Sequence, residues 1–224
     1  MPLEREEMFG GEGSVDPYSL YPKEKFIPIL DGDTIKTQGA HLKVFHTPGH
    51  ANDHIVLMLE EENAMFTADN VLGIGTTVFR DLKTYMNSLR VMAAMSPARL
   101  YPGHGPVVEN GSSKIAEYID HRLTRIKATI SVLGKQPPDD AEAWTLESLT
   151  RTMYSEIPEH LVWPAMVNTL LVLTALRQDG IVTPVFSPSE TAADVHHIVP
   201  SRSWQLSLSE EKAHALVADL SSKM

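Results

Sequence analysis

The sequence contains no cysteine, no long apolar run and no cluster of basic residues. The absence of cysteine excludes a disulfide framework, a thiolate zinc finger and a cysteine nucleophile. The longest apolar candidate, around residues 170–176, is interrupted by Thr174 and followed by Arg177, so it is too short to span a membrane. The 19 Lys and Arg against 29 Asp and Glu give a net charge of −10. This charge disfavours nucleic acid and anionic membranes as partners.

Composition predicts a globular protein. The chain has 224 residues, of which 42% are hydrophobic and 21% charged, enough for one medium domain with a smaller appendage. The opening segment contains Glu4, Arg5, Glu6 and Glu7, a pattern that no secretion signal has. We therefore expect a soluble cytoplasmic protein.

The first two thirds of the chain predict a layered α/β domain, because strands alternate with helices. After an irregular stretch over residues 1–25, strands are expected at 26–30, 34–37, 42–46 and 98–101, with a hairpin formed by 54–59 and 64–68. Apolar side chains at helical spacing indicate one helix, with Asp81 as its expected N-terminal cap, and a long amphipathic helix that ends at Gly134.

The rest of the chain predicts a small helical unit. Residues 135–144 have the composition of a linker, and helices are expected at about 145–156 and 158–179, followed by a strand from Ile181. Helix, helix and strand in this order resemble a winged-helix unit. Residues 184–204 are rich in Pro, Ser and Thr and are expected to be a mobile connector. Ser207 and Glu210 stand at capping-box spacing before a docking helix or a frayed tail.

Three segments place a potential metal ligand where a strand ends. They are Thr47-Pro-Gly-His50, Phe66-Thr-Ala-Asp69 and Tyr101-Pro-Gly-His104. Pro and Gly stiffen the turns before both histidines, as a site that must be formed before metal arrives requires. A single histidine in a turn is more often a surface residue, but two Pro-Gly-His turns that flank a strand-terminal aspartate are hard to obtain by chance.

These segments resemble the metallo-β-lactamase superfamily. The matching stretches are His46–His50, Asp53-His54, Leu59–Asn63, Phe66–Gly73, Tyr101–Val108 and Tyr118–Arg122. The resemblance is greatest to lactamase-like proteins, a branch that includes an animal endoribonuclease and fungal thioesterases that release polyketides from acyl carrier proteins. It covers about residues 31–182.

The resemblance implies a fold and a site. The fold would be a partial αββα sandwich over residues 1–134, a winged-helix-like unit over 135–183 and a flexible tail, with a possible terminal helix, over 184–224. By resemblance, His50 would bind a first zinc ion, Asp69 would bridge two and His104 would bind the second. His54 would support the ligands or the structure, and His121 would be a surface or helix-end residue. No catalytic residue is assigned.

The superfamily's His-x-His-x-Asp-His segment does not occur in this sequence. The residues before His41 resemble the region downstream of that segment, so we expect the opening strands of the sandwich to be absent as well. In the family geometry, His50, Asp69 and His104 are divided between two metals, which leaves each ion with few ligands. A single metal held by all three would need a contracted site.

Three functions are consistent with these residues. The first is zinc-dependent hydrolysis of an acyl thioester, with a polyketide on an acyl carrier protein as the implied substrate. The second is an inactive, truncated relative that acts only by binding or is a remnant, which the missing segment favours. The third is an endoribonuclease, which the acidic composition disfavours. Cleavage of penicillins is the least favoured, because the sequence has no secretion signal.

Overall fold

The computed structural model describes residues 27–185 and 203–222, and it divides into two compact units, one ending at Tyr118 and the other beginning at Ile119. Helix α3 (Gly111–Leu133) belongs to both. The other elements of the first unit are β1 (Thr34–Thr37), β2 (Ala40–His46), β3 (Ile55–Leu59), the 3₁₀ turn η2 (Glu60–Glu62), β4 (Ala64–Ala68), α2 (Leu82–Ala94) and β5 (Arg99–Pro102).

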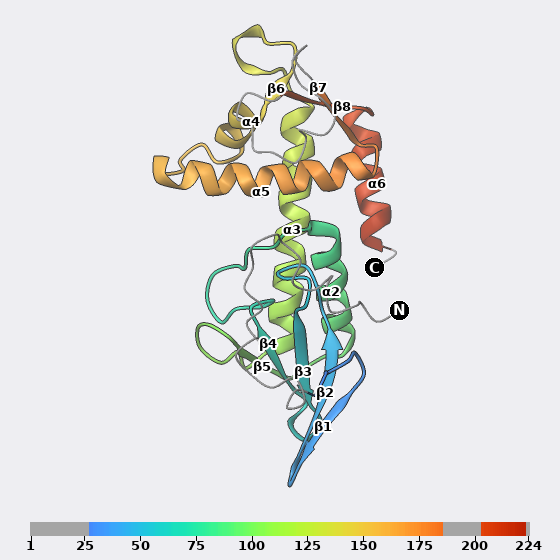
Figure 1. The fold of residues 1–224 in the computed structure, drawn as a ribbon. Helices are drawn as coiled ribbons and strands as arrows, with labels where there is room; N and C mark the ends of the chain where they lie inside the picture. The colour runs from blue at the N-terminus through green and yellow to red at the C-terminus, as the bar shows by residue number, and fades with distance from the viewer. Residues whose placement is uncertain (1–26, 186–202, 223–224) are drawn as a thin grey trace. The chain divides into compact units, whose positions relative to one another are not determined.

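The first unit contains one five-stranded sheet in the order β1-β2-β3-β4-β5 (Figure 1). Strands β1 to β4 are successively antiparallel, and β5 runs parallel to β4. The predicted hairpin of β3 and β4 is confirmed. Its acidic turn is the η2 segment, closed by Asn63 in the left-handed conformation (φ +48°).

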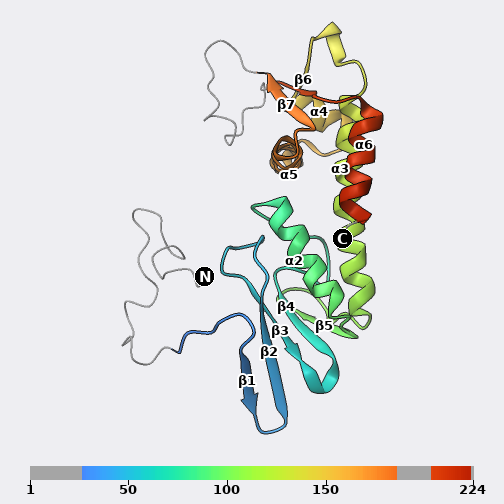
Figure 2. The ribbon, with the colours of Figure 1, turned by 90° about the vertical axis from the view of Figure 1, so that its right-hand side faces the viewer.

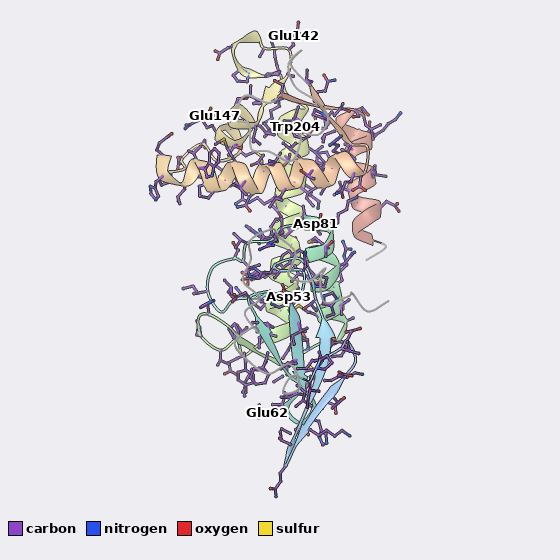
Figure 3. The ribbon with its side chains drawn as sticks, viewed as in Figure 1. Asp53, Glu62, Asp81, Glu142, Glu147 and Trp204 are labelled. Carbon is purple, nitrogen blue, oxygen red and sulfur yellow. The ribbon has the colours of Figure 1, made fainter. Side chains whose placement is uncertain are left out.

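Helix α2 and the first turns of α3 cover one face of this sheet (Figures 1 and 2). The core contains side chains from both layers: Val56, Met65 and Leu100 from the sheet, Tyr85, Leu89 and Met92 from α2, and Ile115 and Tyr118 from α3. The α2 residues recur every three or four positions, which places them on the buried side of the helix. The predicted cap is confirmed, because the Asp81 carboxylate (labelled in Figure 3) accepts a hydrogen bond from the Thr84 N–H at 2.7 Å.

The strand predicted at 26–30 is wrong over its described part. Residues 27–30 form no strand and are exposed, and β1 pairs instead with β2. Pro28 has no N–H to donate to a ladder, and the Leu30 N–H is taken by the Asp33 carboxylate at 2.8 Å. The proposed irregular stretch over residues 1–25 lies outside the described residues.

Among its described residues, the second unit contains the rest of α3, a short 3₁₀ helix, three further α-helices and a small sheet. These elements are η3 (Pro138–Asp140), β6 (Trp144–Thr145), α4 (Leu146–Met153), α5 (Glu159–Gln178), β7 (Val182–Val185), β8 (Ser203–Leu206) and α6 (Glu210–Ser222). The sheet order is β6-β8-β7, all antiparallel, with Trp204 fully buried at its centre (Figure 3). The predicted helices and the strand after Ile181 are confirmed.

Helix α5 forms the apolar centre of the second unit. Its buried side chains include Val162, Met166, Leu170 and Leu173. By length and composition alone, α5 could cross a membrane, but half of the relevant stretch is buried within the protein, as in a core helix. The pattern therefore carries no argument for a membrane span.

Two sequence expectations for the second unit are wrong. The ends of the proposed connector, Pro184-Val185 and Ser203-Trp204, are paired strand residues in β7 and β8, while residues 186–202 lie outside the described part of the chain. Ser207 does not cap α6. Its hydroxyl pairs with that of Thr183 and its N–H donates to the Ile181 carbonyl, so Ser209 takes the capping position, receiving the Lys212 N–H at 3.4 Å.

Candidate metal site

Topology brings the three predicted ligands to one edge of the sheet. Because β3 is antiparallel to both β2 and β4, and β5 is parallel to β4, strands β2, β4 and β5 all run in the same direction. His50, Asp69 and His104 each follow the carboxyl end of one of these strands. Side chains at the carboxyl ends of co-directional strands meet at the same sheet edge.

Asp69 lies between the two imidazoles. Its Oδ2 is 3.8 Å from His50 Nε2, and its Oδ1 is 3.5 Å from His104 Nε2. The side chains of His50, Asp69 and His104 are 26%, 37% and 75% exposed, so the site is open to solvent on the His104 side. Over residues 27–185 and 203–222, no group of three or more ligand-type side chains has the geometry to hold one metal ion. The three residues thus form two nitrogen–oxygen pairs that share one carboxylate.

A backbone carbonyl determines which nitrogen of His50 is free. Its Nδ1 is 2.8 Å from the Val78 carbonyl oxygen, which can only accept, so the proton of the neutral ring lies on Nδ1. The Nε2 lone pair consequently faces Asp69. This arrangement, in which the far ring nitrogen of a histidine donates to a carbonyl, is the usual support of a metal ligand. No sequence signal identified Val78, because the contact uses its backbone.

The turn before His50 is packed against α2. The Ser88 hydroxyl donates to the Pro48 carbonyl at 2.6 Å, and the Arg80 N–H donates to the Gly49 carbonyl at 2.7 Å. Gly49 has φ +131°, and a Cβ there would lie 2.5 Å from the Tyr85 Cα. Glycine is therefore required for close approach to the helix as well as for the bend.

Two neighbouring residues orient Asp69: Ala68, which has a left-handed backbone conformation, and Gly103, which has no side chain. Ala68 has φ +41°, a left-handed conformation that non-glycine residues adopt at an energetic cost and that is frequent at functional sites. Gly103 donates its N–H to the Ala68 carbonyl at 2.8 Å, and a Cβ on Gly103 would lie 2.8 Å from Asp69 Oδ1. The Pro-Gly turn before His104 therefore leaves room for the carboxylate.

Replacing Gly103 with alanine is expected to displace the Asp69 carboxylate. The added methyl group would overlap Oδ1, so we expect zinc affinity to fall about 10-fold or more, as when the support of a ligand is lost. The measurement is competition with a zinc indicator. Gly75→Ala is the control, since Gly75 also has a positive φ (+74°) but a Cβ on it would meet no atom within 4 Å. Equal zinc affinity of the two variants would contradict this role of Gly103.

His54 is buried behind His50. The two rings meet edge to face, with centroids 5.9 Å apart, and His54 Nδ1 is 3.1 Å from the Thr47 hydroxyl. Its Nε2 is buried and has no hydrogen-bond partner among the residues that the structure describes. Burial lowers the pKa of His54 from 6.5 to about 4, and the neighbouring His50 contributes to the lowering. His121 lies in the middle of α3 and is half-buried, so the helix-end position considered for it is wrong.

The lowered pKa of His54 makes the stability of the fold depend on pH. Between pH 6.5 and 4 the unfolded chain takes up a proton that folded His54 does not, so the free energy of unfolding falls as the pH falls through this range. We expect a contribution of about 3 kcal/mol at most. Urea unfolding at pH 7 and pH 5 tests this: His54→Gln should reduce the difference, whereas the variant His160→Gln, at an exposed position that does not influence His54, should retain it. An unchanged difference in His54→Gln would contradict the assignment.

The donor set fits zinc, although incompletely. Zinc takes imidazole nitrogen and carboxylate oxygen at about 2.0–2.2 Å, so two ligands of one tetrahedral ion lie roughly 3.3–3.5 Å apart. The separations of 3.5 and 3.8 Å around Asp69 are close to this value. Each position nevertheless has only one nitrogen and one oxygen among the described residues. The residues fit two neighbouring zinc positions joined by Asp69, each needing further ligands.

Comparison with known proteins decides the family. Residues 2–104 match the family model of the metallo-β-lactamase superfamily, and residues 145–185 match that of the β-lactamase associated winged helix domain. The chain belongs to the metallo-β-lactamase superfamily. The predicted fold class, a lactamase-type α/β domain followed by a winged-helix-like unit, is thereby confirmed.

Curated relatives within the superfamily share about two fifths of their aligned residues with this chain. A β-lactamase-like protein 2 homolog of Caenorhabditis elegans is 42% identical over 159 residues, which are 71% of this chain and 52% of that protein. Lactamase-like protein vrtG of Penicillium aethiopicum is 39% identical over 176 residues, 77% of this chain and 57% of that protein. The chain thus spans about half the length of the curated relatives it matches.

Solved structures agree on the fold. A β-lactamase domain protein from Burkholderia ambifaria superposes with a TM-score of 0.66 at 18% identity, covering 81% of this chain and 52% of that one. The metallo-β-lactamase family protein TTHA1429 from Thermus thermophilus gives a TM-score of 0.59 at 23% identity, covering 80% and 54%. At these identities the likeness supports the fold alone.

Proposed function

We propose that the protein is a zinc-dependent hydrolase of acyl thioesters that releases a polyketide from an acyl carrier protein. The observation that carries the proposal is the position of Asp69, whose two carboxylate oxygens each face the Nε2 of a different histidine. His50 and Asp69 Oδ2 would hold one zinc ion, and His104 and Asp69 Oδ1 the other. Bound zinc would supply a Lewis acid that polarises the thioester carbonyl.

The protein's own groups prepare this site in three ways. The Val78 carbonyl keeps the proton on His50 Nδ1, so Nε2 stays available as a ligand. Gly103 leaves space for the Asp69 carboxylate. The Gly73 N–H donates to the His104 carbonyl at 2.9 Å, which joins the loop after β4 to the histidine turn after β5. Preorganised ligands lower the cost of assembling the site when the metal binds.

The thioester and the carrier protein come from the resemblance of the sequence motifs to fungal lactamase-like thioesterases. A neutral thioester also suits a chain with a net charge of −10 better than RNA does, since an endoribonuclease needs a basic surface for phosphates. One alternative retains a specific observation in its favour. Each metal position has only two donors among the described residues, as expected of a protein that binds without catalysis.

A thiol-release assay separates hydrolysis from binding alone. Because the chain has no cysteine, a thiol reagent reports only thiol released from an acyl-N-acetylcysteamine substrate. We expect release that rises with added zinc, stops with a chelator and is lost in His50→Ala and His104→Ala. Measurable zinc binding without thiol release would favour the binding protein. Release insensitive to the chelator would overturn the zinc-hydrolase proposal.

A further inference from the structure

Three exposed apolar side chains flank the candidate metal site. They are Ile74, Val78 and Val107, with exposed fractions of 73%, 67% and 46%, and we call them the apolar rim. A single exposed aliphatic residue on a protein surface needs no explanation. These three come from two loops: residues 72–80 after Asp69, which contact both histidines of the site, and residues 105–108, which directly follow His104.

The contacts of these loops place the rim beside the histidines. The carbonyl of Val78 accepts the hydrogen bond from His50 Nδ1 at 2.8 Å. The neighbour of Ile74, Gly73, donates to the His104 carbonyl at 2.9 Å, and a Cβ on Gly105 would lie 2.8 Å from the Ile74 nitrogen. Val107 follows His104 by three residues. The rim therefore extends from one histidine of the site to the other.

Both loops lack charge next to the site. Residues 72–79 and 105–108 contain no Asp, Glu, Lys or Arg, and the charged side chains that follow them, Arg80 and Glu109, are both exposed. Loops that recognise a phosphate backbone carry several basic side chains. A surface with aliphatic side chains and no charge instead gains free energy by covering an apolar group.

We propose that the apolar rim binds the hydrocarbon part of the acyl group whose carbonyl is cleaved at the metal site. This inference rests on the proposed thioester hydrolysis and adds a substrate class to it: thioesters of extended apolar acyl groups, in preference to acetyl and other short acyl groups. Complete burial of a methylene group tightens binding roughly fourfold. The rim would cover only one side of the acyl chain, so about half of that free energy is gained and binding should tighten about twofold per methylene.

The test uses the 224-residue chain and a series of S-alkyl-N-acetylcysteamine thioethers, from ethyl to decyl. These probes have no carbonyl and cannot be hydrolysed, so their dissociation constants from calorimetry report binding without activity. We expect about twofold tighter binding per methylene over at least the first four methylenes added. Val78→Ser and Val107→Ser should each reduce this increment markedly.

Val91→Ser is the matched control. Val91 is 45% exposed, nearly the same as Val107 at 46%, but it lies on α2 outside both loops. All three positions are exposed, and circular dichroism verifies that the variants fold. The rim is supported if the control keeps the wild-type increment and the two rim variants lose it.

The outcomes also separate the rim from the proposed function. The protein could bind longer alkyl probes more tightly, lose this effect in the rim variants and yet hydrolyse no thioester. That result would support the apolar rim as a binding surface and overturn the proposed hydrolase function. If the protein hydrolyses thioesters but the dissociation constants of the thioether probes do not depend on alkyl length, the rim proposal is overturned and the hydrolase function stands. An increment that Val78→Ser and Val107→Ser leave unchanged would likewise overturn the rim.

Discussion

Asp69→Asn should weaken zinc binding by about 100-fold or more, because Asp69 is the only carboxylate in contact with both histidines among the described residues. The asparagine has nearly the same volume, so the β4 end and its packing remain. It loses the negative charge and one of the two oxygens that face His50 and His104. Both proposed zinc positions therefore lose a charged ligand in a single change.

The measurement is zinc content after dialysis, together with competition against a zinc indicator. Asp53→Asn serves as the control, since Asp53 is an exposed carboxylate three residues after His50 (labelled in Figure 3). We expect the control to bind zinc as the unmodified protein does. Retention of full zinc content in Asp69→Asn would show that the metal, if bound, is held elsewhere.

Gly49→Ala should destabilise the first unit by about 3 kcal/mol or more. The new Cβ would lie 2.5 Å from the Tyr85 Cα, a contact with helix backbone that no side-chain rotation relieves. The residue would also have to adopt φ +131°, which L side chains rarely do. Moving α2 away would break the Ser88 hydroxyl contact with the Pro48 carbonyl.

Gly32→Ala isolates the backbone effect from the clash. Gly32 also has a positive φ (+85°), but nothing lies within 4 Å of a Cβ there, so we expect a cost of about 1 kcal/mol. Urea unfolding of both variants at neutral pH gives the comparison. If Gly49→Ala were no less stable than Gly32→Ala, the close packing of the His50 turn on α2 would be wrong.

Local patterns in the sequence were sufficient for most elements. The alternation in residues 42–46 and the acidic turn between 59 and 64 predicted β2 and the β3–β4 hairpin, because side chains in a strand alternate between its faces. Helical spacing and the Asp81 cap predicted α2. Such signals predict an element reliably where the segment itself contains both the apolar face and the residues that begin or end the helix or strand.

Elements that depend on distant partners were not predictable in this way. Trp204 and its neighbours look like part of a Pro- and Ser-rich connector, yet they form the central strand of the second sheet because Trp144 and Pro184 pair beside them. Ser207 has capping-box spacing, but its backbone N–H and hydroxyl pair with Ile181, in the turn after α5, and with Thr183 of β7. The pairing partner, which lies far away in sequence, decided both cases.

The sequence by itself determined the candidate ligands: two Pro-Gly-His turns and one strand-terminal aspartate, each at the end of its own strand. The tertiary structure alone decided that they meet, because their proximity follows from three strands pointing the same way in one sheet. It also decided how they are held, through the Val78 carbonyl on His50 and the space that Gly103 leaves for Asp69. These are contacts between backbone atoms and residues distant in sequence, which leave no pattern along the chain.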